Sequence, residues 1–294
     1  MVDGILNIDK PFGRTSFSIV GMVRRLSGEK RVGHAGTLDP AATGVLPICL
    51  GQATRVTEFF HDMPKVYRAE IELGTSTDTY DATGRIVQQG DLSQITRTQL
   101  ESALSHFRGE IEQIPPMYSA AKHQGKPLYK LARAGVSVER KSRPAKIYNL
   151  ELLDFELPLV KIEVTCGKGV YIRSLAHDLG QALGCGAHLK SLIRLKYGNF
   201  DIDNAITISQ LEDAFSYGYW QNFIHPVDSV LLDWTAMVLS ENTELDIKNG
   251  CLSDLKSPMA ANRCRAYDTD GHFWGVLRFS PEKSQWLPGK ILKS

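Results

Sequence analysis

The sequence lacks the features that mark secreted, membrane-bound and zinc-containing proteins. Its five cysteines are an odd number and include no C-x-x-C pair, which argues against a disulfide framework and a structural zinc site. No apolar run is long enough to span a membrane, and the opening residues MVDGILNIDKP lack a basic segment followed by an apolar one. We therefore expect a reduced, cytoplasmic protein that has neither a metal site nor a membrane partner.

Motifs for nucleotide cofactors are missing as well. Neither G-x-G-x-x-G nor a P-loop occurs, and no internal repeat is apparent. A net charge of +1 gives no general attraction to a polyanion, so any nucleic-acid partner has to be bound by local basic patches. With 43% hydrophobic and 23% charged residues, the 294-residue chain has the composition of a folded protein and the length for a large domain plus a small one.

A tight loop ahead of an apolar strand is the clearest candidate for a positioned reactive group. Within Arg31–Leu50, RVGHAGTLDPAATGVLPICL, three glycines permit unusual backbone angles and Pro40 pushes Asp39 out of the α region. His34 and Asp39 are thereby held in irregular backbone before Val45–Leu50, which we expect to be a buried strand. From the loop alone, a structural Asp-Pro turn explains Asp39 as well as a catalytic carboxylate does.

Hydrophobic periodicity predicts a mixed set of strands and helices. Strict alternation over Lys65–Gly74 indicates a strand whose core face begins with Tyr67, and a packed aromatic is the ordinary explanation of that residue. Leu189–Lys196 also reads as a strand, with basic side chains on one parity, as is common at exposed sheet edges. We further predict helices that begin at Thr15 or Ser16 and at Thr96, helices over Ala53–His61, Leu175–Leu183 and Ile208–Ala214, and strands over Gly4–Ile8, Arg85–Gln89 and within Leu150–Cys166.

The segment Ile114–Tyr148 is rich in basic residues interleaved with tyrosines. Such a composition can contact phosphates and stack on unpaired bases, although a solvated basic face is the usual explanation of a charge run. Between Pro115 and Lys146, Glu139 is the only acid, and this lack of compensating charge favours a nucleic-acid partner. The basic residues are Lys122, His123, Lys126, Lys130, Arg133, Arg140, Lys141, Arg143 and Lys146.

Two features follow in the C-terminal half of the chain. Gly167-Lys168-Gly169 breaks a strand, and if the chain stays extended beyond it, Tyr171 and Arg173 project to the same side. That arrangement would place a hydroxyl and a guanidinium side by side. The pattern then becomes loop-like over Asn222–Thr235, where we expect a domain boundary. Short apolar runs punctuated by glycines follow and predict a small β-rich module.

Five long, irregular motifs make the chain resemble the bacterial tRNA pseudouridine-55 synthases, which isomerise a uridine in the T-arm loop of tRNA. Two departures from the family pattern are visible. Ala134 replaces a usual Glu, and Ile193 replaces the first Arg of an LRR segment, which puts one expected basic contact in doubt. The motifs are KPFGRTS at Lys10–Ser16, GHAGTLDPAATGVL at Gly33–Leu46, TDTYDATG at Thr77–Gly84, PPMYSAAKHQGKPLYKLARAG at Pro115–Gly135 and GKGVYIRSLAHDLG at Gly167–Gly180.

The resemblance implies an α+β fold in two parts. A catalytic domain of the pseudouridine-synthase type, built on a mixed, mainly antiparallel sheet, would span residues 1–230. An RNA-gripping insertion would interrupt it at about 115–148, and a PUA-like RNA-binding domain would span residues 231–294. The implied partner is the T-arm stem-loop of tRNA, and we expect a monomer.

The resemblance also implies the parts of a catalytic site. Asp39 would be the catalytic aspartate, Arg173 its ion-pair partner, Tyr67 the aromatic against the target base and Tyr171 a lining residue. His34 would enter the RNA loop near the space left by the flipped nucleotide. The chemistry agrees, because moving a uracil from N1 to C5 attachment involves no net redox change and needs no cofactor. It does need an ionised carboxylate in a pocket that excludes water, and an adjacent arginine lowers the pKa of such a group.

Two other classes of function stay open on the sequence alone. A non-catalytic RNA-binding or RNA-remodelling protein could use the same pocket only to capture a flipped base. A hydrolytic glycosidase would need a carboxylate pair or an activated water, whereas the motif loop offers only Asp39. The sequence also leaves open whether Asp39 attacks the sugar or the base, and which group accepts the final proton.

Overall fold

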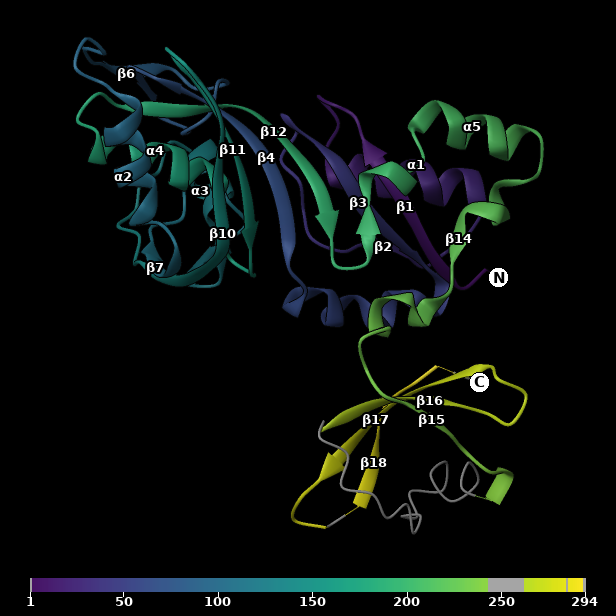
Figure 1. The fold of residues 1–294 in the computed structure, drawn as a ribbon. Coiled ribbons are helices and arrows are strands. Elements are labelled where there is room, and N and C mark those ends of the chain that lie inside the picture. Colours follow the sequence, from purple (N-terminus) through teal and green to yellow (C-terminus); the bar gives the residue numbers. More distant parts are fainter. Residues whose placement is uncertain (1, 243–261, 284, 293–294) are drawn as a thin grey trace.

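The computed structural model describes residues 2–242, 262–283 and 285–292, which form a large sheet with helices on it and a smaller C-terminal sheet (Figure 1). The ten strands of the large sheet pair antiparallel, except that β3 and β12 run parallel, so the mixed, mainly antiparallel α+β class is confirmed. The main path is β14 (Ile224–His225), β1 (Gly4–Lys10), β3 (Ala42–Leu50), β12 (Ala187–Tyr197), β4 (Lys65–Leu73), β11 (Leu159–Cys166), β10 (Arg143–Glu156) and β7 (Gly109–Gln113), with β2 (Val32–His34) on β3 and β13 (Phe200–Asp201) on β12.

Three of the α-helices begin after a threonine whose side chain caps them. At α1 (Ser16–Ser27), Thr15 Oγ1 accepts a hydrogen bond from the Ser18 amide, which satisfies a free N–H of the first turn. Capping boxes with Thr96 and Thr207 start α2 (Arg97–Ser105) and α5 (Ile208–Ser216). The helix predicted over Ala53–His61 is instead a 3₁₀ helix. The other helices are η1 (Gly51–Asp62), α3 (Leu128–Arg133), α4 (Ile172–Ala182), η2 (Ile202–Asn204), η3 (Trp220–Phe223) and η4 (Val227–Leu231).

The strand β4 has the predicted alternation and carries Tyr67 into the core. Tyr67, Ala69, Ile71 and Leu73 are all buried, while Arg68 on the opposite face is exposed. β4 pairs with β11 on one side and β12 on the other, so it lies in the middle of the sheet. The apolar face of this strand therefore forms part of the main core, against β11, β12 and the helices.

The strand predicted over Leu189–Lys196 is confirmed as part of β12, but it is not an exposed edge. β12 lies between β3 and β4, and Arg194 has none of its surface exposed. Register shifts after Leu189 and after Arg194 interrupt simple alternation, so Arg194 turns into the protein. Lys190 stays on the surface, where it pairs with Glu72 at 3.2 Å.

The chain does not stay extended as far as Arg173. Tyr171 is extended, but α4 begins at Ile172, which places Arg173 in the first turn of a helix. Neighbouring side chains fix this early start. Gln113 both accepts from the Tyr171 amide at 2.8 Å and donates to the Tyr171 carbonyl at 3.0 Å, and Ser174 Oγ donates to the Ile114 carbonyl at 2.7 Å.

The C-terminal sheet packs against the large domain through η1. It has its own core of buried residues, which includes Trp274 and Trp286. Lys290 pairs with Glu58 of η1 at 2.8 Å, which ties the two parts together. No helix among the described residues is long and apolar enough to cross a membrane. The strands of this sheet are β15 (Ala236–Val238), β16 (Arg263–Tyr267), β17 (Phe273–Ser280) and β18 (Gln285–Ile291), and two hairpins lie outside both sheets, β5 (Thr75–Thr77) with β6 (Ile86–Gln89) and β8 (Lys122–His123) with β9 (Lys126–Pro127).

Candidate functional site

A cavity of about 230 Å³ contains four of the five residues that the sequence singles out. Asp39 comes from the loop before β3, Tyr67 from β4, and Tyr171 and Arg173 from the start of α4. His34 is not among the residues that line this cavity. The residues contributed by the sheet come from its centre, where β12 joins β3 to β4 (Figure 1).

Buried side chains fix the loop that carries Asp39. Ser16 Oγ donates to the Leu38 carbonyl at 3.0 Å and accepts from the Leu38 amide at 2.9 Å. On the opposite side, Arg194 donates to the Gly36 carbonyl at 3.0 Å and to the Val45 carbonyl at 2.7 Å. Loop backbone groups on both sides of Asp39 are therefore bonded, which pre-organises the position of its carboxylate.

Two glycines allow the loop to follow this path. Gly36 has φ +63° and Gly44 has φ +98°, in the region that favours glycine. A Cβ on Gly44 would lie 2.3 Å from the Arg194 carbonyl oxygen. Gly44 is therefore required for the close approach of β3 to β12.

Arg173 is buried and binds two carboxylates. Its Nη2 lies 2.9 Å from Asp39 Oδ2, and its Nη1 lies 3.6 Å from Asp81 Oδ2. It also donates to the carbonyls of Thr79, at 3.4 Å, and Tyr118, at 2.8 Å. One guanidinium thus joins the Asp39 loop, the segment with Asp81 and the start of the basic segment Ile114–Tyr148.

The environment of Asp39 changes its acidity in opposing directions. Loss of hydration raises the pKa of the carboxyl above its usual range, while Arg173 and, more weakly, Lys10 lower it. The net direction is upward, so the arginine acts as expected but does not outweigh burial. The Asp39 side chain keeps 42% of its surface accessible because it faces the cavity, so access for a ligand and enclosure by protein coexist.

The other side chains of the cavity combine an aromatic surface with positive charge. Burial raises the pKa of the Tyr67 hydroxyl, so Tyr67 is neutral at physiological pH. Lys65 lies two residues before it on the same strand and also lines the cavity. Burial lowers the pKa of Lys65 to about 8, and its ammonium lies 4.4 Å from the centre of the Tyr197 ring. The cavity therefore suits a flat, anionic or hydrogen-bonding ligand.

His34 lies beside the site and not in it. It ends β2, which pairs with β3 through His34 and Ile48. Burial lowers the pKa of the His34 imidazole, and its Nδ1 atom is buried without a hydrogen-bond partner. A neutral imidazole is available next to the loop of Asp39.

Several residues of the site have no recognisable signal in the sequence, among them Asp81, Arg194 and Gln113. Asp81 falls in the TDTYDATG motif, which by itself assigns no role to this residue. Its Oδ1 accepts hydrogen bonds from Thr79 Oγ1 and from the amide and hydroxyl of Thr83. The pattern around Arg194 is the same as that of its neighbouring lysines, and Gln113 has no local signal because its role depends on Tyr171, 58 residues away.

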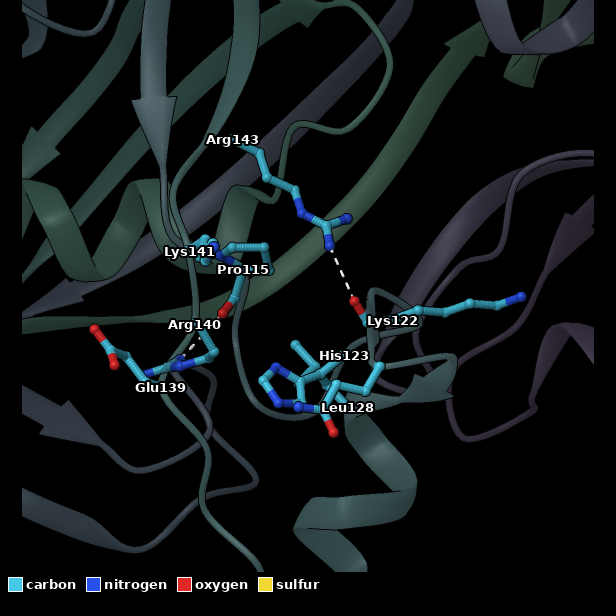
Figure 2. Close-up of a pocket in the computed structure, with 9 residues that line it drawn as sticks. Pro115, Lys122, His123, Leu128, Glu139, Arg140, Lys141 and Arg143 are labelled. Atoms are coloured by element: carbon cyan, nitrogen blue, oxygen red, sulfur yellow. Dashed lines mark hydrogen bonds between the residues drawn. The ribbon is translucent and has the colours of Figure 1, made fainter.

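A second, larger cavity of about 440 Å³ lies in the basic segment Ile114–Tyr148 and contains none of the predicted catalytic residues (Figure 2). Arg143 donates to the Lys122 carbonyl and Arg140 to the Pro115 carbonyl, both at 3.1 Å, as the dashed lines of Figure 2 show. Within the described part of the chain, neither arginine forms an ion pair. The backbone thus orients these cations without neutralising them, which fits contact with phosphates.

One group within the described residues could hold a metal ion. Asp268, Asp270 and His272 place possible ligand atoms within 4.8 Å of one another in the turn between β16 and β17. Asp268 Oδ1 already accepts hydrogen bonds from the amides of Asp270 and His272. This group stabilises a turn of the C-terminal sheet and does not line the cavity with Asp39.

Comparison with solved structures assigns the class of fold. A chain in the "Crystal Structure of a Cbf5-Nop10-Gar1 Complex" superposes with a TM-score of 0.76 at 25% sequence identity, covering 99% of this chain and 85% of that one. A chain in the "Structure of H/ACA RNP bound to a substrate RNA containing 2'-deoxyuridine" gives a TM-score of 0.75 at 22% identity, with the same coverage. The chain therefore shares its fold over almost its whole length with the matched chains of these two complexes.

Sequence comparison narrows this class to one family. Residues 24–172 match the TruB family pseudouridylate synthase (N terminal domain), and residues 173–232 match the tRNA pseudouridylate synthase B C-terminal domain. The tRNA pseudouridine synthase B of Dehalococcoides mccartyi is 44% identical over 291 residues, covering 99% of this chain and 96% of the relative. That of Pseudomonas aeruginosa is 43% identical over 298 residues, covering 100% and 97%. The chain belongs to the TruB family of pseudouridylate synthases.

Proposed function

We propose that the protein converts uridine 55 in the T-arm loop of tRNA to pseudouridine, with Asp39 as the catalytic carboxylate. The observation that supports this most directly is the 2.9 Å ion pair between Asp39 and Arg173 in a cavity that also contains Tyr67. A carboxylate held by a buried guanidinium stays directed at one place, and the aromatic ring beside it offers a surface for a base. The curated relatives are named as enzymes that form pseudouridine in tRNA.

The proposed reaction breaks the bond between N1 of uracil and C1′ of ribose, turns the base, and joins C5 to C1′. The proton on C5 is then lost and N1 gains one, so atoms and charge balance without an oxidant or a cofactor. Asp39 must be ionised to take part, as a nucleophile or as a base. Because burial raises its pKa, activity should fall on acidification at a pH above the ordinary titration of an aspartate.

The remaining predicted residues would hold the flipped nucleotide. Tyr67 would pack against the uracil ring, and Tyr171 would line the other part of the same cavity. Arg173 would keep Asp39 oriented, since its guanidinium contacts no other carboxylate than Asp39 and Asp81 within the described residues. His34 would occupy the space in the RNA loop that the flipped uridine leaves, which compensates part of the cost of unstacking.

RNA affinity would come mainly from outside this cavity. The basic insertion at about 115–148 would bind the phosphate backbone, with Arg140 and Arg143, which form no ion pair within the described residues, as contacts. The C-terminal sheet would be a PUA-like RNA-binding domain that spans residues 231–294 beside a catalytic domain of residues 1–230. We place the reaction in the cytoplasm and expect a monomer to perform it without metal.

Replacing Asp39 by Asn tests the catalytic assignment. The amide cannot act as a nucleophile or a base, so pseudouridine formation on an unmodified tRNA transcript should fall by at least about a thousandfold. The Kd for the same tRNA should change by less than about threefold, because affinity comes chiefly from phosphate contacts. Pseudouridine would be measured by release of tritium from 5-tritiated uridine, and Asp91→Asn, on an exposed loop, provides a matched loss of one carboxylate.

The products distinguish the competing functions. Normal turnover by Asp39→Asn would disprove the role of Asp39. Tight tRNA binding by the wild-type protein without any pseudouridine would instead indicate a non-catalytic RNA-binding protein. Release of free uracil would indicate a glycosidase.

A further inference from the structure

The surface around the start of α1 carries two large aromatic side chains with no apparent structural task. Phe12 and Phe17 are 71% and 72% exposed. Within the described residues, neither ring belongs to a hydrophobic core cluster or pairs with another aromatic ring. Exposed single hydrophobic residues are ordinary, but these two phenylalanines are both highly exposed and only five positions apart in the sequence. Neither side chain is needed for the core of the domain.

These phenylalanines lie on the segment that holds the catalytic loop. The Gly13 amide donates to the Pro40 carbonyl at 2.8 Å, one residue after Asp39. Ser16 is bonded to the backbone of Leu38, as described above. The stretch with Phe12 and Phe17 is therefore directly attached to the loop that lines the cavity.

The stretch of chain that carries the two rings has positive charges and no acid. No acidic residue occurs between Lys10 and Gly28, whereas Arg14, Arg24 and Arg25 are exposed. On a helix of 3.6 residues per turn, Phe17 and Arg24 share one face about 10 Å apart. Gly21 lies between them, and a Cβ there would meet nothing within 4 Å, so the helix surface is open between the ring and the guanidinium.

We infer that Phe12 and Phe17, with Arg14, Arg24 and Arg25, form a stacking surface for single-stranded nucleotides next to the catalytic cavity. The inference rests on the proposed function, because the occupant would be the unpaired part of the tRNA whose uridine enters the cavity. Exposed rings can stack on bases, and arginines beside them can contact the phosphates of the same strand. A protein partner would fit the rings, but the lack of any acid in the stretch favours a polyanion.

Paired substitutions at Phe12 and Phe17 test the surface. The Kd for an unmodified full-length tRNA would be measured by filter binding in the Asp39→Asn protein, so that no turnover occurs. Changing both residues to Ser should weaken binding at least about fivefold, since each stacked base contributes to affinity. Changing both to Tyr should keep the Kd within about twofold, because the ring is retained.

Two further pairs separate stacking from general apolar contact and from folding effects. Changing both phenylalanines to Leu keeps apolar area but removes the π-face, so binding should weaken as it does with Ser. Ile86→Ser with Val87→Ser removes two exposed apolar side chains from β6, at the far end of the large sheet (Figure 1), and should leave the Kd unchanged. Melting curves for all variants would show that they are folded.

The arginines should have a different signature. Changing Arg24 and Arg25 to Gln should reduce the slope of log Kd against log salt by about 1 to 2, because each lost phosphate contact releases one counterion fewer. The Ser pair at Phe12 and Phe17 should leave that slope unchanged. In the protein with Asp39 intact, the Ile86 and Val87 control pair should leave the single-turnover rate at saturating enzyme unchanged.

The inference is overturned if the Ser pair binds tRNA within twofold of the parent, or if the Leu pair binds as the parent does. It is also overturned if the wild-type protein sediments as a dimer that the Ser pair dissociates, since the surface would then be a protein contact. If the wild-type protein makes no pseudouridine while the Ser pair still loses affinity, the proposed function fails and the stacking surface remains.

Discussion

The conservative change Arg173→Lys should remove most of the activity although it keeps the charge. Arg173 uses one terminal nitrogen for Asp39 and the Tyr118 carbonyl, and the other for Asp81 and Thr79. A lysine has one ammonium on an unforked chain, so it cannot contact both carboxylates and the Tyr118 carbonyl at once.

The size of the loss follows from the contacts removed. About two charged hydrogen bonds disappear, each contributing about 1.5 to 3 kcal/mol in buried surroundings. Because Asp39 remains partly accessible, the summed loss of these hydrogen bonds is about 3 kcal/mol. When this loss raises the activation free energy, the rate falls about a hundredfold. Single-turnover pseudouridine formation at saturating enzyme would measure this, with Arg68→Lys as the control, since Arg68 pairs with Glu163 on the surface at 3.0 Å.

A rate for Arg173→Lys within about threefold of the wild type would refute this reasoning. Combination with Asp81→Asn adds a second check on the same geometry. If Asp81 acts through Arg173, the double variant should lose less activity than the product of the single effects. Strictly additive losses in activation free energy would show that Asp81 acts independently.

Two changes outside the cavity test the packing. Gly44→Ala should lower the free energy of unfolding, measured in urea, by about 3 kcal/mol, because Gly44 has a positive φ and the added Cβ would clash with the Arg194 carbonyl oxygen. Gly21→Ala should raise the free energy of unfolding by about 0.5 kcal/mol, because alanine favours the helix and nothing obstructs its Cβ. Equal effects of the two changes would contradict the close approach of β3 to β12. Burial raises the pKa of Asp178 to about 6, so its ionised form destabilises the fold increasingly as the pH rises from about 4 to 6. Asp178→Asn should therefore increase the free energy of unfolding at pH 8 by about 1 kcal/mol, because the group is partly exposed, and should raise Tm accordingly. This gain should disappear by pH 4. An unchanged Tm at pH 8 would contradict the prediction.

Local patterns predicted those parts of the fold that depend on neighbours in sequence. The alternation of β4 placed Tyr67 on its buried face, and Thr96 marked the start of α2. The loop of Asp39 was also found from its own residues, because its glycines and proline are local causes. Long motifs added the pairing of Asp39 with Arg173, which no short pattern contains.

Features set by distant residues could not be predicted in this way. Arg194 carries the same local signal as the neighbouring lysines, and only its place between β3 and β4 makes it buried. The start of α4 at Ile172 depends on Gln113, which lies far away in the sequence at the end of β7. Asp81 has no visible role until Arg173 is positioned beside it.

The central place of β12 has a consequence for the newly made chain. β3 and β4 are both hydrogen bonded to β12 and not to one another, so the two halves of the sheet meet only through this strand. Since β12 ends at Tyr197, a ribosome has made two thirds of the protein before Asp39 and Tyr67 can be brought to the same cavity. A truncated chain that stops before β12 would contain both residues and have no site, and its two exposed strand edges would make it prone to aggregate.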